Sequence, residues 1–157
     1  MIIKLEGFSE LETTLLNLTK EISSRGENLE FRRVLTKSAE AAMQPVMLSA
    51  MAMAPYDAMH NTTGIHLRET VRLDSRIPDG KDIQSHYVNQ SDAAIAVVSV
   101  KKSAVSLSQE FGNARTTAQP YLRVSLERNK DRVFEILKSE MTARMQAFIN
   151  RIARRRA

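Results

Sequence analysis

Residues 120–152 read PYLRVSLERNKDRVFEILKSEMTARMQAFINRI, and this stretch decides the fold. Proline is well suited to the first turn of a helix, so Pro120 marks the start of one. Apolar side chains then recur at helical spacing for about 30 residues. They are Leu122, Leu126, Val133, Leu137, Met141, Phe148 and Ile152. The pattern predicts one long C-terminal helix that carries a single apolar stripe, with Arg and Lys on its other faces.

The length of this helix sets an expectation about partners. At 1.5 Å per residue it would extend roughly 45–50 Å. The chain has 157 residues, and a compact domain of that size would be only about 26 Å across. We therefore expect that part of the apolar stripe contacts another protein, or that the last turns fray.

Two more helices are expected in the N-terminal third of the chain. Ser9 and Glu12 have the spacing of a capping box, and the apolar residues up to Ile22 then follow at helical intervals. A second helix begins near Asn28 and keeps an apolar face for about six turns, with a kink expected at Pro45. It carries the methionines Met43, Met47, Met51 and Met53. Their helical spacing favours ordinary core positions over a ligand groove.

The middle of the chain has the pattern of a small antiparallel sheet. Residues 71–77, 83–88 and 94–100 favour β-strands, and a short turn at Ser91 and Asp92 would join the last two. The segment from Ala54 to Gly64 lacks periodicity and is expected to be a loop. These runs predict a three-stranded meander.

Residues 103–111 fit a short helix that Gly112 ends. The predicted fold class is therefore α+β: a small antiparallel β-sheet packed with two N-terminal helices and a long C-terminal helix. Residues 1–150 would form one domain, and residues 151–157 a basic C-terminal tail.

Composition excludes several classes of protein. There is no Cys, which rules out thiolate metal sites and thiol chemistry. No stretch reaches the roughly 20 apolar residues of a membrane helix, so a soluble protein without membrane contacts is expected. Nucleotide-binding, zinc-protease and serine-hydrolase motifs are absent. We expect no enzymatic activity and no cofactor.

The remaining candidate ligands do not form a convincing site. The histidines His60, His66 and His86 lie in expected loop and strand regions, without the spacing that places two imidazoles on one helix face. Asp79 and Asp82 bracket a turn, where carboxylates commonly bind the backbone. The sequence therefore predicts neither a metal site nor a catalytic carboxylate pair.

Charge is distributed unevenly along the chain. Residues 1–100 contain 10 Lys and Arg against 13 Asp and Glu, whereas residues 101–157 contain 13 against 5. The overall net charge is +5. A basic C-terminal end can be a solvated helix face, or it can meet a partner or assembly surface of opposite sign.

Two stretches are more specific than the rest. The first joins Ala54 and Pro55, after a loop, to Thr63, Gly64 and the residues up to Arg68. The second reads EFGN at 110–113 and AQPYLRVSLE at 118–127. With the opening LEGFSEL at 5–11, these motifs resemble, in order along nearly the whole chain, the small head–tail joining or tail-completion proteins of long-tailed bacteriophages. Tyr121 and Asn113 stand where that family usually has Phe and Thr.

The resemblance implies a structural virion protein of the phage neck. Such a subunit would form a homo-oligomeric ring, a hexamer by family analogy, that completes or caps the tail tube and joins it to the head connector. Its partners would be the tail-tube or tail-terminator protein and the head connector proteins. It would be located in the virion, and in the host cytoplasm during assembly. A role as the tail terminator itself stays open, because both roles need a small ring-forming α+β protein.

The motif residues are the candidate contacts with partners. They are Thr63, Gly64, Leu67, Arg68, Glu110, Phe111, Gly112, Gln119, Pro120, Tyr121, Leu122 and Arg123. The same residues could instead form a corner that specifies the fold without touching a partner. Arg68 and Arg123 are expected to pair with Glu110 and Glu127, within one subunit or between subunits, rather than with DNA.

Non-specific DNA binding is the main alternative function. The sequence has a pI near 9.7, and a cluster of arginines near its end provides a positive footprint for phosphate. The candidate DNA-facing residues are Arg151, Arg154, Arg155 and Arg156. No aromatic residue interleaves with them to form a stacking platform.

Overall fold

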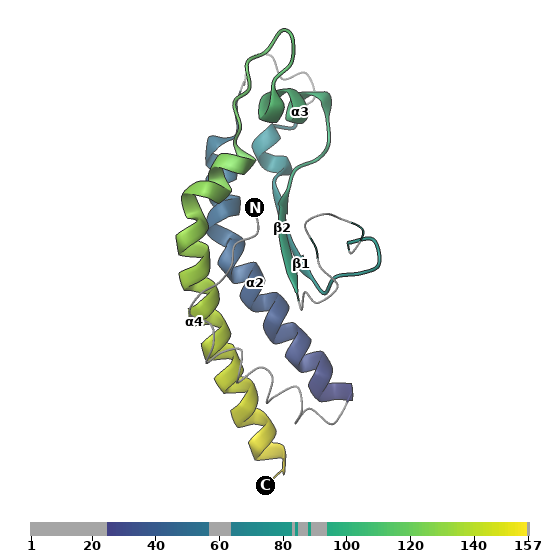
Figure 1. Cartoon of the computed structure of the whole chain (residues 1–157), viewed down its shortest axis with the longest axis vertical. Helices are drawn as coiled ribbons and strands as arrows, with labels where there is room; N and C mark the ends of the chain where they lie inside the picture. The colour runs from purple at the N-terminus through teal and green to yellow at the C-terminus, as the bar shows by residue number, and fades with distance from the viewer. Residues whose placement is uncertain (1–24, 57–63, 83, 85–87, 89–93, 157) are drawn as a thin grey trace.

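The computed structural model describes residues 25–56, 64–82, 84, 88 and 94–156 (Figure 1). In chain order, the elements are helix α2 (Arg25–Met53), the 3-10 helix η1 (Leu67–Thr70), strands β1 (Arg72–Arg76) and β2 (Ile95–Ser99), and helices α3 (Ala104–Phe111) and α4 (Leu122–Arg156). The fold is α+β: three α-helices with a two-stranded antiparallel sheet packed against α2. The helix predicted from Ser9 lies outside the described residues.

Helices α2 and α4 form a long antiparallel pair (Figure 1). At one end, Phe31 and Leu35 of α2 are buried together with Met145, Phe148 and Ile152 of α4. At the other end, Ala50 and Ala54 pack with Tyr121, just before α4 begins. The two helices therefore cover each other over most of their lengths.

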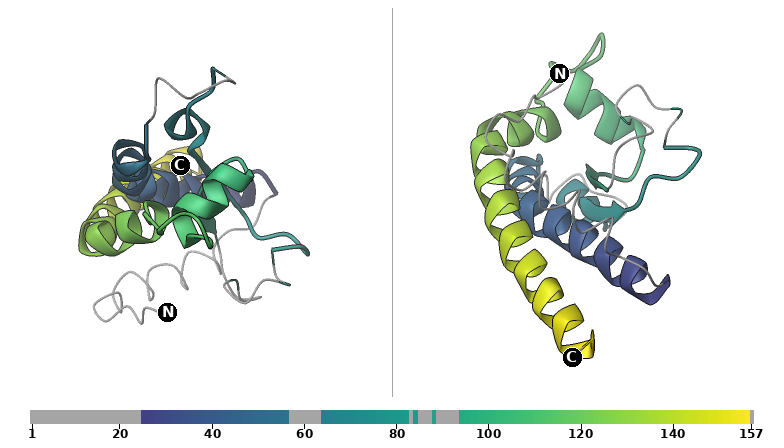
Figure 2. Two further views of the ribbon diagram at one scale, coloured as in Figure 1. Left: turned by 90° about the horizontal axis from the view of Figure 1, so that it is seen from above. Right: turned by 60° about the horizontal axis from the view of Figure 1, so that its bottom comes forward.

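One side of α2 is buried along the whole helix, as the sequence predicted. The buried residues recur every three or four positions and include small side chains that let neighbouring elements approach. They are Phe31, Leu35, Ser38, Ala42, Val46, Ala50 and, just beyond the helix, Ala54. Pro45 lies inside a continuous helix. Figure 2 shows α2 in contact with α4, with the sheet close by it.

The sheet corrects the predicted meander. Strand β1 pairs directly with β2, from Arg72 opposite Ser99 to Arg76 opposite Ile95. A three-stranded meander would have placed residues 83–88 beside β1 instead. Only positions 84 and 88 of that run are described, and neither is in a strand. Because β1 pairs directly with β2, the first and third strands of the predicted meander are neighbours in the sheet.

Polar side chains organise the turn that follows β1. Asp79 Oδ1 accepts hydrogen bonds from the backbone N–H groups of Lys81 (2.8 Å) and Asp82 (2.9 Å). Asp82 in turn binds the guanidinium of Arg76, at 2.7 Å from Nη2. The prediction that these two carboxylates form a turn is confirmed.

The apolar stripe that the sequence predicted on α4 is buried or half-buried at six of its seven positions, and the exception is Leu126. Ser125 is buried, whereas Leu126 beside it is 45% exposed. Buried and half-buried positions from Ser125 to Met145 recur every four residues, slightly more than one turn, so the buried side of α4 shifts gradually around the helix. The helix packs on a different cluster at each end, and its buried side rotates between them.

The long helix also finds its cover within the chain. With 29 residues, α2 runs beside α4 and buries Phe148 and Ile152 close to the C-terminus. The molecule is elongated rather than spherical (Figure 1). The prediction that the stripe contacts another protein or frays is therefore wrong for the end of α4, because it assumed a round domain.

Three of the four methionines of α2 pack against the core, as predicted. Met47, Met51 and Met53 pack against the cluster of Ala50, Ala54, Val71 and Tyr121. Unbranched thioether side chains fill irregular gaps between helices and a sheet.

None of the described helices is both long and apolar enough to span a bilayer.

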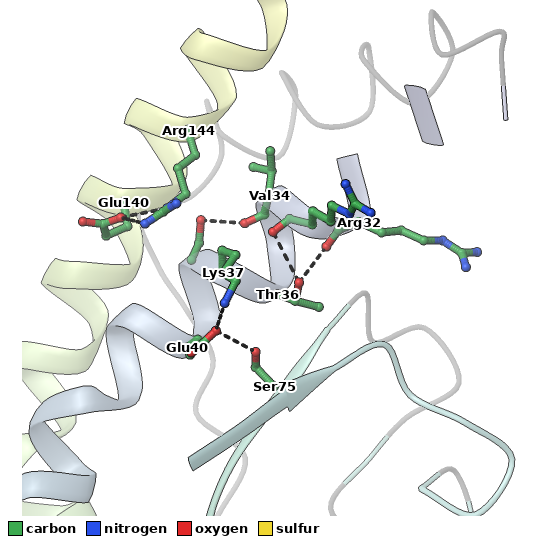
Figure 3. A network of polar contacts seen from close by, with 10 residues as sticks. Arg32, Val34, Thr36, Lys37, Glu40, Ser75, Glu140 and Arg144 are labelled. Carbon is green, nitrogen blue, oxygen red and sulfur yellow. Dashed lines mark hydrogen bonds and ion pairs between the residues drawn. The ribbon is translucent and has the colours of Figure 1, made fainter. Parts of the chain in front are cut away.

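A small polar network ties α2 to β1 (Figure 3). Glu40 Oε2 accepts hydrogen bonds from Lys37 Nζ (2.7 Å) and Ser75 Oγ (3.5 Å). The hydrogen bond from Lys37 lowers the pKa of Glu40 below its usual value, against the opposing effect of burial. On α4, the side chains of Arg144 and Glu140 pair at 2.8 Å.

Candidate functional site

The two halves of the second motif meet at the corner between α3 and α4. Glu110 Oε2 accepts hydrogen bonds from the backbone N–H groups of Tyr121 (2.9 Å) and Leu122 (3.0 Å). Its Oε1 accepts from the backbone N–H (3.2 Å) and from Nε (3.0 Å) of Arg123. Arg123 Nη2 also donates to the backbone carbonyl of Glu110 (2.9 Å). One carboxylate therefore satisfies N–H groups at the start of α4 that have no partner within the helix.

The electrostatics of this corner favour an ionised Glu110. Its residue is 4% exposed, and burial alone would raise its pKa. The hydrogen bonds from Leu122, Tyr121 and Arg123 outweigh burial and hold the pKa of Glu110 below its usual value. A carboxylate at a helix N-terminus is also stabilised by the helix dipole.

The loop between α3 and α4 is built from its own backbone. Gly112 N–H donates to Ser108 O and ends α3. Asn113 Oδ1 accepts from the N–H groups of Arg115 and Thr116, both at 2.8 Å. Gln119 N–H donates to Gln109 O at 2.7 Å, which brings the loop back to α3. The loop is therefore a closed turn anchored at both ends.

Gly112 occupies a conformation that other residues rarely adopt. Its φ is 76° and its ψ is 174°, a combination that is essentially confined to glycine. A Cβ placed there would lie 3.0 Å from the backbone nitrogen of Ala118. The sequence predicted this glycine as the end of α3, and both predictions, the helix and its end, are confirmed.

Helix α3 is amphipathic in the reverse of the usual sense. Ser106 and Glu110, four residues apart, point inward and are buried. Leu107 and Phe111, also four apart, are 44% and 64% exposed on another side. Ser103 caps the first turn by accepting a hydrogen bond from Ser106 N–H at 3.0 Å. The helix thus buries polar groups and presents apolar ones to solvent.

The exposed ring of Phe111 lies beside a cation. The guanidinium carbon of Arg123 is 5.2 Å from the centre of the ring, within the range of a cation–π contact. Since Arg123 is also bound to Glu110, the ring rests on a side chain that is itself held in place. The predicted pair of Arg123 with Glu110 is confirmed.

The first motif reaches the same core cluster as the second. Gly64 has a φ of 69°, and Leu67 packs on the core cluster that contains Tyr121. The guanidinium carbon of Arg68 lies 4.2 Å from the centre of the Tyr56 ring, which also stacks on His66 at 4.2 Å. Thr63 lies outside the described residues.

Within one subunit, Arg68 does not form the ion pair that the sequence predicted, and a pair between subunits stays a prediction. Among the described residues, it forms an ion pair with neither Glu110 nor Glu127. Its Nε is buried and has no hydrogen-bond partner within the described part of the chain. The sequence did not identify Tyr56 as the partner of Arg68, because the two residues are 12 positions apart and no local pattern relates them.

The C-terminal arginines belong to the helix. Arg151 Nη1 and Arg155 Nη2 lie 3.6 and 2.9 Å from the carboxylate of Glu30 on α2. Arg154 is exposed, and α4 continues to Arg156 without a break at residue 150. Two of the four candidate DNA-facing residues therefore already have a carboxylate partner in the chain.

Among the described residues, no group of three or more His, Asp or Glu side chains could hold a metal ion. His60 and His86 lie outside that part of the chain.

Sequence reasoning missed Leu107 as a surface residue, although its spacing of four from Phe111 was a usable signal.

Comparisons with family models, with curated proteins and with solved structures gave no match to this chain.

Proposed function

We propose that this chain is a ring-forming structural subunit of the neck of a long-tailed bacteriophage, which completes the tail tube and joins it to the head connector. The role is geometric rather than catalytic. The observation that carries the proposal is the α3–α4 corner. There the motif residues that prompted the resemblance contact one another, while the neighbouring apolar side chains face outward.

The corner has the properties that an assembly contact needs. Glu110, Gly112 and the start of α4 are fixed by hydrogen bonds and by a glycine conformation. Phe111 and Leu107 are thereby held at defined positions on the surface. A preorganised apolar surface loses little conformational entropy when a partner binds it.

The elongated shape supports the same role. The pair of α2 and α4 forms a rod, with the sheet against α2 and α3 near one end (Figure 1). Subunits of this kind can associate side by side through unlike surfaces, and such contacts close into a ring when the rotation between neighbours permits.

The test is assembly of the purified protein, alone and mixed with the tail-tube protein of the same phage. Native mass spectrometry and negative-stain electron microscopy should reveal a ring, hexameric by family analogy. A discrete ring, alone or in the mixture with the tail-tube protein, would support the proposal. A strict monomer in both samples, at concentrations up to the millimolar range, would refute it.

Non-specific DNA binding is a second candidate, favoured by the cations on α4. Arg128, Lys130, Arg132 and Lys138 are exposed on this helix, as is Arg154. Phosphate contacts of this kind release counterions, so affinity should fall steeply with salt. An inward-facing α4 in a neck ring would also meet DNA, and the two roles are compatible.

Duplex binding at about 50 and 200 mM salt tests this candidate. Arg154→Gln should lower the slope of log affinity against log salt by about 0.9 if this side chain contacts a phosphate. Arg33→Gln, an exposed position on α2, is the matched control. Equal slopes for both variants and the unmodified protein would remove the end of α4 from DNA binding.

A further inference from the structure

The outward side of α3 lacks the polar surface expected of a solvated helix. Ala104, Leu107 and Phe111 lie within about 60° of one another around the helix axis, and all three are exposed. Val105 is exposed on an adjacent side. We call these four residues the α3 face. Burying such a face in a contact is favourable, because it removes apolar area from water.

Cations flank the α3 face along the chain. Lys101 and Lys102 precede the helix, and Arg115 follows it in the loop; all three are exposed. Within the described part of the chain, none of the three forms an ion pair. The only acidic residue between positions 101 and 126 is Glu110, which is buried and already bound by Arg123. The surface that fits here is therefore apolar and acidic.

Helix α4 carries a run of acidic residues that suits such a contact. Glu127, Asp131 and Glu135 follow one another at intervals of four, and all three are exposed. Among the described residues, none of their carboxylates forms an ion pair, although Arg128 and Arg132 lie along one flank and Lys138 follows about one turn later on the same side. We call these three residues the α4 row. The half-buried side chains of Val124 and Phe134 lie within about 60° of it around the helix.

The two surfaces also match in length. The α3 helix has eight residues, and its length is about 12 Å at 1.5 Å per residue. The α4 row covers a rise of about 12 Å as well, from Glu127 to Glu135. A helix of this length laid along the row therefore spans it from Glu127 to Glu135. The cations that precede and follow α3 would then lie near the two ends of the row.

We propose that the α3 face of one copy of this chain docks on the α4 row of a second copy. The inference rests on the proposed ring-forming role and identifies the surfaces through which neighbouring subunits meet. Because the two surfaces differ, each bound copy leaves one of each free, and association repeats head to tail. Opposite charges around an apolar centre favour this register over like-to-like pairing.

Charge exchange tests the inference most directly. Sedimentation of the full chain would measure its self-association constant in four forms: unmodified, Lys101→Glu with Lys102→Glu, Glu127→Lys with Glu135→Lys, and all four substitutions together. Each pair alone should weaken association by about tenfold or more, because it places like charges in contact. The fourfold variant should recover most of that loss, which a merely structural effect of the substitutions would not produce.

Apolar variants test the centre of the same contact. Leu107→Ser with Phe111→Ser should abolish association, whereas Leu48→Ser, at a residue 60% exposed on α2, should leave it unchanged. Circular dichroism melting would verify that each variant folds, which is expected because all these positions are exposed.

Other outcomes would separate this inference from the proposed function. A ring that persists in the α3 and α4 variants overturns the docking surfaces but leaves the neck role standing. No self-association of the unmodified chain overturns the docking inference, and the neck role then depends on its own test with the tail-tube protein. Loss of DNA binding but not of association in the lysine variant would assign the cations to DNA and also overturn the inference.

Discussion

Arg155 at the end of α4 donates a hydrogen bond to Glu30 at the start of α2, with Nη2 and Oε1 2.9 Å apart. The contact joins residues separated by 125 positions in the chain. Ile152, one turn earlier on α4, is buried beside Phe31 and Leu35. The last turns of α4 are therefore packed into the fold rather than attached to it as a tail.

Packing rather than charge should dominate the stability of this end. Ile152 is 8% exposed, so Ile152→Ala should lower the free energy of unfolding by about 2–4 kcal/mol. Arg155→Ala removes an ion pair whose arginine is largely exposed, and should cost less than about 1 kcal/mol. Urea denaturation followed by circular dichroism measures both. Equal effects of the two substitutions would contradict the packing of Ile152 described above.

The ionisation of Glu110 should make the fold sensitive to acid. Its pKa is lower in the folded protein than in the unfolded chain, where it is about 4.3. Between these two pKa values the unfolded chain binds more protons, so stability increases with pH. The contribution of Glu110 is therefore complete above the unfolded pKa and is lost as the pH falls through the folded one.

Glu110→Gln tests this dependence. The variant should be less stable at pH 7 and should lose less stability between about pH 6 and pH 3. Glu140→Gln at a half-buried position of α4 is the matched control, since its partner Arg144 lies on the same helix. Parallel stability curves for Glu110→Gln and the unmodified protein would show that this carboxylate is not the group that titrates.

Gly112 should tolerate substitution poorly. Gly112→Ala forces a Cβ into a glycine-only conformation and against the backbone of Ala118, and should cost about 1–3 kcal/mol. Gly80 has open space around its Cα, so Gly80→Ala should be nearly neutral. Thermal melting of both variants gives the comparison. A neutral Gly112→Ala would mean that the corner can adopt another backbone geometry.

Local signals explain which elements the sequence predicted well. Ser103 and Gly112 mark the ends of α3 through a cap and a positive φ, and each acts within a few residues. The apolar period of α2 was equally readable, because one side of that helix is buried throughout. Such features depend on short-range chemistry, which a single sequence contains.

Features that depend on distant contacts were less accessible. The exposure of Leu126 follows from the rotation of the buried side along α4, which depends on how α2 and α4 cross. The pairing of β1 with β2 depends on the path of the chain between them. The hydrogen bonds that the start of α4 donates to Glu110 are an intermediate case. The motif indicated a corner, but it did not indicate that one carboxylate caps the helix.

The hydroxyl of Tyr121 gives the last prediction. The residue is 0% exposed, and within the described part of the chain its hydroxyl has no hydrogen-bond partner. Burial and the nearby charge of Glu110 raise the pKa of Tyr121, so the hydroxyl stays protonated at neutral pH. A buried polar group without a partner loses its hydration and gains nothing in return.

Tyr121→Phe should therefore keep the fold and raise the free energy of unfolding by about 1 kcal/mol. Tyr56→Phe is the control, because Tyr56 is 51% exposed; it should change stability by less than about 0.5 kcal/mol. A clear loss of stability in Tyr121→Phe would show that the hydroxyl binds a buried water or another group, since only a satisfied hydroxyl is costly to remove.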